Sequence, residues 1–244
     1  MPIKLYMDNS ILSIDGVEIQ DTARHIKATR QLIDSVTDPK KRFALRLLYL
    51  TGARASELAG RPVNTDDIAY GIQAKDVKKG NYRMPDGTVE DLVLINIRIL
   101  KKRIPNEVPI DERRERYPKR IVALPLKYEP WASNILAVAN SVKDPSKFLI
   151  PNTRKEIWQW ISEVGLQGWK DKNGYNLKNP LRHIRANHLI SYYQFTPIQL
   201  VTYFGWGHQT LGNITGQATS PMLDWYLNLS WQGYIMQLMI PLPS

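Results

Sequence analysis

The sequence contains no cysteine among its 244 residues, and its acidic side chains are outnumbered by basic ones. The lack of cysteine excludes a disulfide framework, thiolate metal sites and thiol chemistry. No apolar run reaches the length of a membrane span, and charges of both signs interrupt the N-terminal segment, which is not a signal peptide. We therefore expect a soluble, cytoplasmic protein. The length allows one large domain or two small ones.

Basic residues dominate the charge of the chain. Lysine and arginine number 33 against 23 aspartates and glutamates, which gives a formal net charge of +10 at pH 7. Such a surface has a positive potential that suits a polyanion. Nucleic acid is therefore the first partner to consider, although a solvated lysine face would give the same composition.

Helices are predicted on both sides of a β-rich region. Asp38 has the character of an N-cap, Pro39 follows at the first helical position, and Gly52 suits a left-handed C-terminal cap. The other expected helices, placed from apolar spacing, prolines and a capping box, cover residues 22–36, 130–141, 153–164, 180–193 and 197–204, with one more around Tyr226.

Between these blocks the apolar pattern becomes extended. Residues 92–100 and 120–126 are rich in β-branched side chains and bounded by turn formers, so both are predicted to be strands. A third strand is expected somewhere within residues 70–83. The basic segment 101–119 is predicted to be a loop at the tip of the sheet.

Two arginine-centred segments, followed by a histidine and a tyrosine, indicate the chemistry. Arg54 lies in residues 51–58 (TGARASEL), Arg182 lies in residues 179–189 (NPLRHIRANHL), and His208 and Tyr226 follow. Arginine presents a fixed fork of donors that matches two phosphate oxygens, and it keeps its charge. Two such forks on one phosphate stabilise charge that grows during attack, and a tyrosine favoured as phenolate by nearby cations can be the nucleophile. These groups can attack a phosphodiester without a metal.

The segments resemble the tyrosine recombinase and integrase family, which shares its catalytic domain with type IB topoisomerases. The family segment T-G-x-R-x-x-E-L is matched by residues 51–58. The segment H-x-L-R-H-x-x-A-T-H-L is matched by residues 179–189, except that Asn179 and Asn187 stand where the family has histidine and threonine. The family's L-G-H is similar to residues 206–208 (WGH), and its tyrosine after S-P resembles Tyr226.

The resemblance implies an α+β fold, mainly α-helical, with a small antiparallel β-sheet. The tyrosine recombinase-like catalytic domain would span residues 39–230. Residues 1–38 would form an arm and a helix, too short for the DNA-clamping domain that usually precedes it. The apolar tail, residues 231–244, could cap its own core, whereas such tails in the family often dock on a neighbouring protomer.

The resemblance also implies roles for particular residues. Arg54, Arg182 and His208 would hold the scissile phosphate, and Tyr226 would attack it. Asn179, in place of the family histidine, would position the phosphate, because an asparagine side chain cannot take a proton near neutral pH.

The leaving 5′ hydroxyl would be protonated by Lys102 or by its neighbour Lys101, since strand alternation lets only one of them face the DNA. No metal, nucleotide or other cofactor is required. The spacing between His208 and Tyr226 is longer than usual in the family, so the tyrosine could act in its own protomer or in a neighbouring one.

Further cations are expected to contact the DNA backbone. Arg185, one turn after Arg182, could face the same phosphate region, a solvent face or an acidic partner. His188 is expected to be packed or bonded to backbone, and Tyr203 and Tyr234 are expected in the core. The predicted DNA-contacting residues are Lys101, Arg103, Arg113, Arg114, Arg116, Lys119 and Arg185.

The sequence thus predicts a site-specific DNA recombinase or integrase, of the kind carried by viral or plasmid mobile elements. It would bind double-stranded DNA as a homotetramer and form a covalent 3′-phosphotyrosine intermediate. Three alternatives use the same residues or their remnants: a type IB topoisomerase, a telomere-resolving enzyme, and a non-catalytic DNA-binding relative.

Overall fold

The computed structural model describes residues 13–63, 68–100, 108–166, 179–206 and 230–243. Its first two helices are α1 (Thr22–Asp34) and α2 (Pro39–Thr51). The Asp38 side chain accepts a hydrogen bond from the backbone N–H of Lys40 at 2.8 Å, which fixes the start of α2. Gly52 ends α2 in the left-handed conformation, with φ of 57°. Both capping predictions are confirmed.

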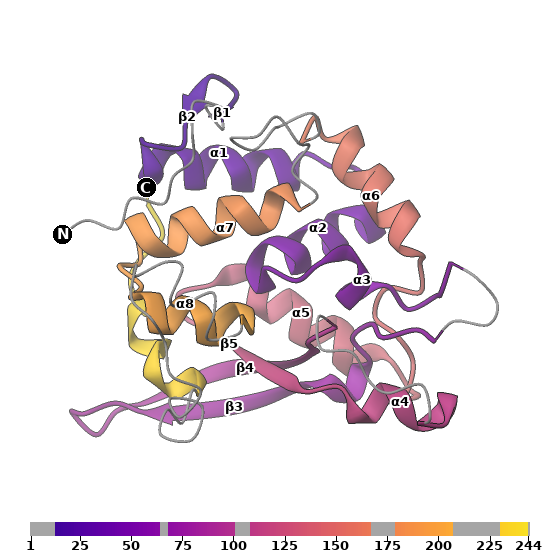
Figure 1. The fold of residues 1–244 in the computed structure, drawn as a ribbon. Coiled ribbons are helices and arrows are strands. Elements are labelled where there is room, and N and C mark those ends of the chain that lie inside the picture. Colours follow the sequence, from indigo (N-terminus) through magenta and orange to yellow (C-terminus); the bar gives the residue numbers. More distant parts are fainter. Residues whose placement is uncertain (1–12, 64–67, 101–107, 167–178, 207–229, 244) are drawn as a thin grey trace, which may run out of the picture.

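The fold is α+β with a small antiparallel sheet (Figure 1). A hairpin of β1 (Ser13–Ile14) and β2 (Val17–Glu18) precedes α1, and the short helix α3 (Ala55–Leu58) follows α2. The later elements are a 3-10 turn (Ala74–Asp76), β3 (Val77–Arg83), β4 (Val89–Arg98), α4 (Ile110–Arg116), β5 (Lys119–Pro125), α5 (Pro130–Ser141), α6 (Arg154–Glu163), α7 (Pro180–Ser191), α8 (Pro197–Phe204) and two further 3-10 turns (Trp231–Gly233 and Ile235–Leu238).

Part of the segment 101–119, expected to be a loop, forms α4, so that prediction is wrong for this stretch. The helix expected around Tyr226 lies outside the described residues. No helix within the described ranges is long and apolar enough to cross a bilayer.

The sheet has the order β3-β4-β5, and both pairings are antiparallel. Successive side chains of the central strand β4 point to opposite faces, and both faces are covered. Val93, Ile95 and Ile97 face the main core on the side of the helices. Leu92 packs with Ala123 of β5 and with Ile235 of the C-terminal tail on the other side. This arrangement explains the almost continuous apolar sequence of β4.

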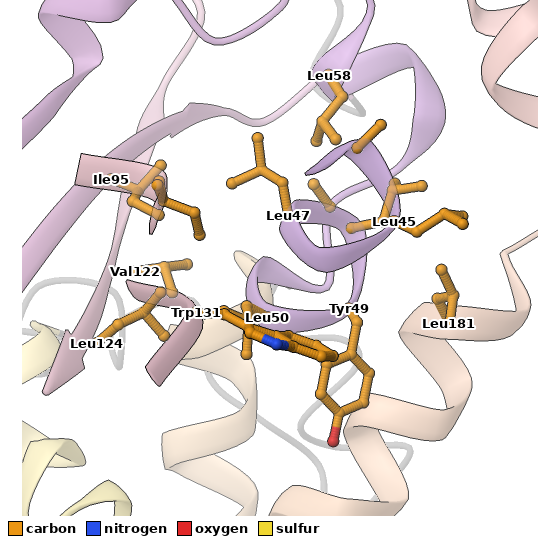
Figure 2. Close-up of a cluster of buried hydrophobic side chains, with 14 of the residues drawn as sticks. Leu45, Leu47, Tyr49, Leu50, Leu58, Ile95, Val122, Leu124, Trp131 and Leu181 are labelled. Atoms are coloured by element: carbon orange, nitrogen blue, oxygen red, sulfur yellow. The ribbon is translucent and has the colours of Figure 1, made fainter. Parts of the chain in front are cut away.

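Helix α2 is the central helix of the core. Leu45, Leu47, Tyr49 and Leu50 are all fully buried. Figure 2 shows these side chains between the sheet, which contributes residues such as Val122, and α7. Because α2 is buried along most of its length, its C-terminal end and the turn into α3 lie inside the protein.

Both chain ends of the described part pack on the same core. In α1, Ile26 and Ile33 are fully buried, and the helix contacts α2 and α7. In the C-terminal tail, the Tyr234 hydroxyl donates to the Ile121 carbonyl at 3.0 Å and accepts from the Ala123 N–H at 3.2 Å. The tail therefore caps its own core at β5, one of the two arrangements that the sequence left open.

Candidate phosphate-binding site around Glu57

The site is built around Glu57, a carboxylate only 1 % exposed in helix α3. Arg54 directly precedes α3, and its Nη1 lies 2.7 Å from Glu57 Oε1. The backbone N–H of Arg54 donates to Glu57 Oε2 at 3.0 Å. The Arg54 side chain is 21 % exposed, so it is held by the carboxylate and still reaches the surface.

Arg182 of α7 approaches the same carboxylate. Its Nη1 lies 3.9 Å from Glu57 Oε2. Nη1 donates to the Gly52 carbonyl at 2.5 Å and Nη2 to the Phe204 carbonyl at 3.1 Å, so the guanidinium joins the C-terminal ends of α2 and α8. The two arginines singled out in the sequence, far apart along the chain, are thus brought together.

Aromatic rings support Arg182 from one side. The guanidinium carbon lies 4.7 Å from the ring centre of Phe204 and 5.6 Å from that of Trp206. The two rings are stacked, with centres 4.7 Å apart and planes at 16°. Contact with the aromatic faces restricts the orientation of the guanidinium.

A third arginine, Arg120 of β5, was missed by the sequence reasoning. Its Nη2 lies 3.9 Å from Glu57 Oε2, and its side chain is 4 % exposed. Strand alternation gave a usable signal, because Arg120 shares a face with Val122 and Leu124, which are buried in the core. A basic residue on the buried face of a strand needs a specific partner.

The electrostatics of the site favour an incoming anion. Burial is the main cause that lowers the pKa of Arg182 well below its usual value, and the nearby charge of Arg120 adds to the effect. Burial likewise lowers the pKa of Arg120, and Glu57 opposes this shift. One carboxylate therefore compensates three guanidinium groups incompletely, and an anionic oxygen at the site would relieve their repulsion.

Asn179 is the residue that directly precedes α7, the helix that contains Arg182. It is half-buried, and its side chain makes no hydrogen bond that caps the helix. Its carbonyl accepts the N–H groups of Arg182 at 3.1 Å and His183 at 3.2 Å. The remaining predicted site residues, Lys101, Lys102, Arg103, His208 and Tyr226, lie outside the described residues.

The predicted DNA contact of Arg185 does not fit its environment. Arg185 is 2 % exposed, and the rings of Tyr49, Tyr193 and Tyr203 surround its guanidinium with centres 5.2, 5.2 and 5.7 Å away. Its Nε donates to the Tyr203 hydroxyl at 3.3 Å. A guanidinium enclosed in this way cannot reach a DNA backbone, so the prediction is corrected.

Arg114 is corrected because two carboxylates hold its guanidinium. It is 8 % exposed and is bound to Asp76 at 3.2 Å and to Glu115 at 2.7 Å. Arg98 joins the same two carboxylates at 3.1 and 3.0 Å. Arg98, Arg114 and Asp76 of this ion cluster are buried, and the cluster attaches α4 to the sheet, which is a structural role.

The other predicted DNA contacts on and near α4 are closer to the surface. Arg113 is half-buried and donates to the Val108 carbonyl at 2.8 Å. Arg116 and Lys119 are exposed and pair with Glu112 at 2.7 Å and Glu115 at 2.8 Å. Exposed pairs of this kind are weak and can be exchanged for phosphate contacts.

Three further expectations concern the core. His188 is fully buried, as expected, but its partners are side chains: Nε2 lies 2.9 Å from His25 Nδ1, and Nδ1 lies 2.9 Å from the Tyr49 hydroxyl. Tyr203 and Tyr234 are fully buried, so their placement in the core is confirmed.

Comparisons of the chain with protein-family models, with curated proteins and with solved structures find no match. Among the described residues, no cluster of three or more histidine, aspartate or glutamate side chains could hold a metal ion. The function is therefore inferred from the residues of the site and their geometry.

Proposed function

We propose that the protein is a DNA strand-cleaving and rejoining enzyme, a site-specific recombinase or integrase with the tyrosine recombinase fold. The observation that carries this proposal is the meeting of Arg54 and Arg182 on Glu57. The shared carboxylate places the two arginines of the two sequence segments beside each other. This placement supports a phosphate site, because two guanidinium forks must lie close together to bind the same phosphate.

In the proposed reaction, Tyr226 attacks the scissile phosphorus as its phenolate. The new bond joins the tyrosine oxygen to phosphorus, and the bond between phosphorus and the 5′ oxygen breaks. The electron pair of that bond leaves with the 5′ oxygen, which takes a proton from Lys102 or Lys101. The product is a 3′-phosphotyrosine and a free 5′ hydroxyl. Reversal of the same steps rejoins a strand, so no nucleotide is consumed.

The arginines supply the electrostatic part of the mechanism. The phosphodiester has one negative charge before attack and gains a second at the transition state. Cations placed beforehand around the phosphate stabilise that gain without reorganisation. Arg54 is the more exposed of the two and would contact the phosphate from the surface, and Arg182 would contact it from the aromatic stack.

The decisive experiment traps the covalent intermediate. The protein is incubated with a pool of random-sequence duplexes carrying single nicks beside the potential cleavage site, and protein–DNA adducts are separated under denaturing conditions. The wild-type protein should form an adduct, and mass spectrometry should locate it on Tyr226. Tyr226→Phe, Arg54→Ala and Arg182→Ala should each abolish it.

Tyr192→Phe is the matched control, because the Tyr192 hydroxyl donates to the Pro241 carbonyl on the surface. It should form the adduct as the wild type does. Failure of the wild type to form an adduct, or an adduct that persists in Tyr226→Phe, would refute the proposed function.

A further inference from the structure

Arg120 and Arg182 make the same kind of contact in adjacent positions. Arg182 donates to the carbonyls of Gly52 and Phe204, and Arg120 donates to the carbonyls that immediately precede them, Thr51 at 3.1 Å and Tyr203. The two guanidinium groups therefore bridge the C-terminal ends of α2 and α8 side by side. In Figure 1, β5, which carries Arg120, runs beneath α8.

These contacts satisfy a general need of helix ends. The last carbonyls of a helix have no partner within the helix, and they form the negative end of its dipole. Two buried helix ends meeting at one place would leave several such carbonyls unpaired. Two arginines supply both the donors and the positive charge, and their forks fix the distance between the helices.

Glycine at the end of α8 admits Arg120 to this position. Gly205 adopts φ of 63°, and a β-carbon there would lie 2.7 Å from Arg120 Cδ. The side chain of Arg120 therefore lies directly against the backbone that leads from Phe204 to Trp206. A shift of Arg120 toward Gly205 would therefore press on the backbone that holds the aromatic pair beside Arg182.

Arg120 also competes with Arg182 for the shared carboxylate. Both guanidinium groups lie 3.9 Å from the same atom, Glu57 Oε2. Without Arg120, that oxygen would draw Arg182 inward to a closer pair. With Arg120 present, the like charge opposes this movement.

We propose that Arg120 is a positioning residue, which holds Arg182 in the orientation that binds phosphate and keeps the site strongly positive. Three guanidinium charges and one carboxylate charge leave a net charge of +2. This equals in size the charge of a phosphodiester at the transition state of attack. Removing Arg120 would leave a net charge of +1, which equals only the charge of the phosphodiester before attack. The substrate named here rests on the proposed function.

Sulfate binding tests the role of Arg120 without catalysis, because sulfate is a dianion over the whole working pH range. Calorimetric titration at constant ionic strength measures its affinity, and the fluorescence of Trp206, taken as the difference from Trp206→Phe, locates the binding. The wild type should bind sulfate, and Arg54→Ala and Arg182→Ala should bind it more weakly. Arg120→Gln should lower the affinity about ten-fold or more, as expected for one charge removed from a partly buried site.

Arg98→Gln is the control for loss of a buried arginine. Arg98 lies on the neighbouring strand β4, is 1 % exposed and pairs with Asp76 and Glu115 at a different place. Arg98→Gln should lower the thermal unfolding midpoint and leave sulfate affinity unchanged. If Arg120→Gln does not fold, Arg120→Lys is tested in its place. Lysine keeps the charge but cannot donate to two carbonyls as the arginine fork does, so this variant should still weaken sulfate binding several-fold.

The outcomes separate this proposal from the proposed function. No sulfate binding by the wild type, or wild-type affinity in the Arg120 variants, would overturn the role of Arg120 even if DNA adducts form. A wild type that forms no adduct but loses sulfate affinity in Arg120→Gln would refute the recombinase and support the positioning role. In a protein that cleaves DNA, Arg120→Gln should slow cleavage of bound DNA more than it weakens DNA binding, because many other phosphates contribute to binding.

Discussion

Gly52 lies so close to Phe204 that a β-carbon on the glycine would be 2.2 Å from Cε1 of the ring. Gly52 also has φ of 57°, which L side chains rarely adopt. The residue that ends α2 therefore has two independent reasons to be glycine. Its carbonyl is the one that Arg182 binds, so the close approach of the two helices and the placement of the arginine depend on each other.

Gly52→Ala is expected to destabilise the protein by about 2–5 kcal/mol, from the left-handed conformation and from overpacking against Phe204. Urea unfolding followed by circular dichroism measures the change. Gly16→Ala is the matched control, because Gly16 has φ of 75° with no atom near the added carbon. The free energy of unfolding of Gly16→Ala should fall by only about 1 kcal/mol. Equal losses at the two positions would contradict the contact with Phe204.

Glu57→Gln should destabilise the protein by about 3–5 kcal/mol, because three buried or half-buried guanidinium groups would lose their counter-charge. Glu163→Gln removes a carboxylate that is 40 % exposed and paired with Lys41, and should lose less than about 1 kcal/mol. Chemical unfolding of both variants makes the comparison. Adding Arg120→Met to Glu57→Gln should recover part of the lost free energy of unfolding. A double variant whose loss equals the sum of the two single losses would contradict the coupling.

Stability should fall as the pH drops below about 6.5, the ordinary pKa of histidine. Burial, His25 and Arg185 lower the pKa of His188 well below that value, so His188 stays neutral in the folded protein. The unfolded chain takes up a proton there and the folded protein does not. The free energy of unfolding should therefore decrease by up to about 1.4 kcal/mol per pH unit for this group.

Urea unfolding between pH 7.5 and 5 measures this slope. Glu115 and Glu156 have pKa values lowered to about 2 from 4.5, so their contributions are lost only at lower pH and leave this window clear. His188→Gln should flatten the slope. His183→Gln, a half-exposed histidine on the same helix, should keep it. An unchanged slope in His188→Gln would show that another group titrates.

DNA binding should distinguish buried from exposed arginines, if the protein binds DNA as proposed. Arg116→Ala removes an exposed cation and should reduce the slope of log affinity against log salt by about 0.9. Arg185→Met removes a cation enclosed by tyrosine rings and should leave the slope unchanged. Fluorescence anisotropy at several salt concentrations measures both. A reduced slope in Arg185→Met would mean that Arg185 does reach DNA.

The sequence predicted the helices best where local chemistry sets their ends. Pro39, Pro130, Pro180 and Pro197 each begin a helix as expected, because proline at the first helical position loses no hydrogen bond. The capping box at Thr153 is present as well. These signals depend on a few neighbouring residues and do not need the rest of the fold.

Residues whose roles depend on distant partners were harder to predict. The charged sequence of α4 has no apolar stripe of its own, and Arg114 is buried only because Asp76 and Arg98 lie where it docks. Arg185 was expected to contact DNA because it lies one turn after Arg182, whereas Tyr49 of α2, Tyr203 of α8 and Tyr193, just after α7, enclose it. Arg120 likewise gained its role from two helix ends and a carboxylate, none of which is near it in the sequence.

The packing of α1 also limits how far the chain can be shortened from its N-terminal side. A protein shortened to begin at Pro39 would expose the surface that Ile26 and Ile33 cover. It would also leave the buried His188 Nε2 without the imidazole that lies 2.9 Å from it. The folded unit thus begins before Pro39, at least as early as α1, and any attempt to isolate or transplant it should keep that helix.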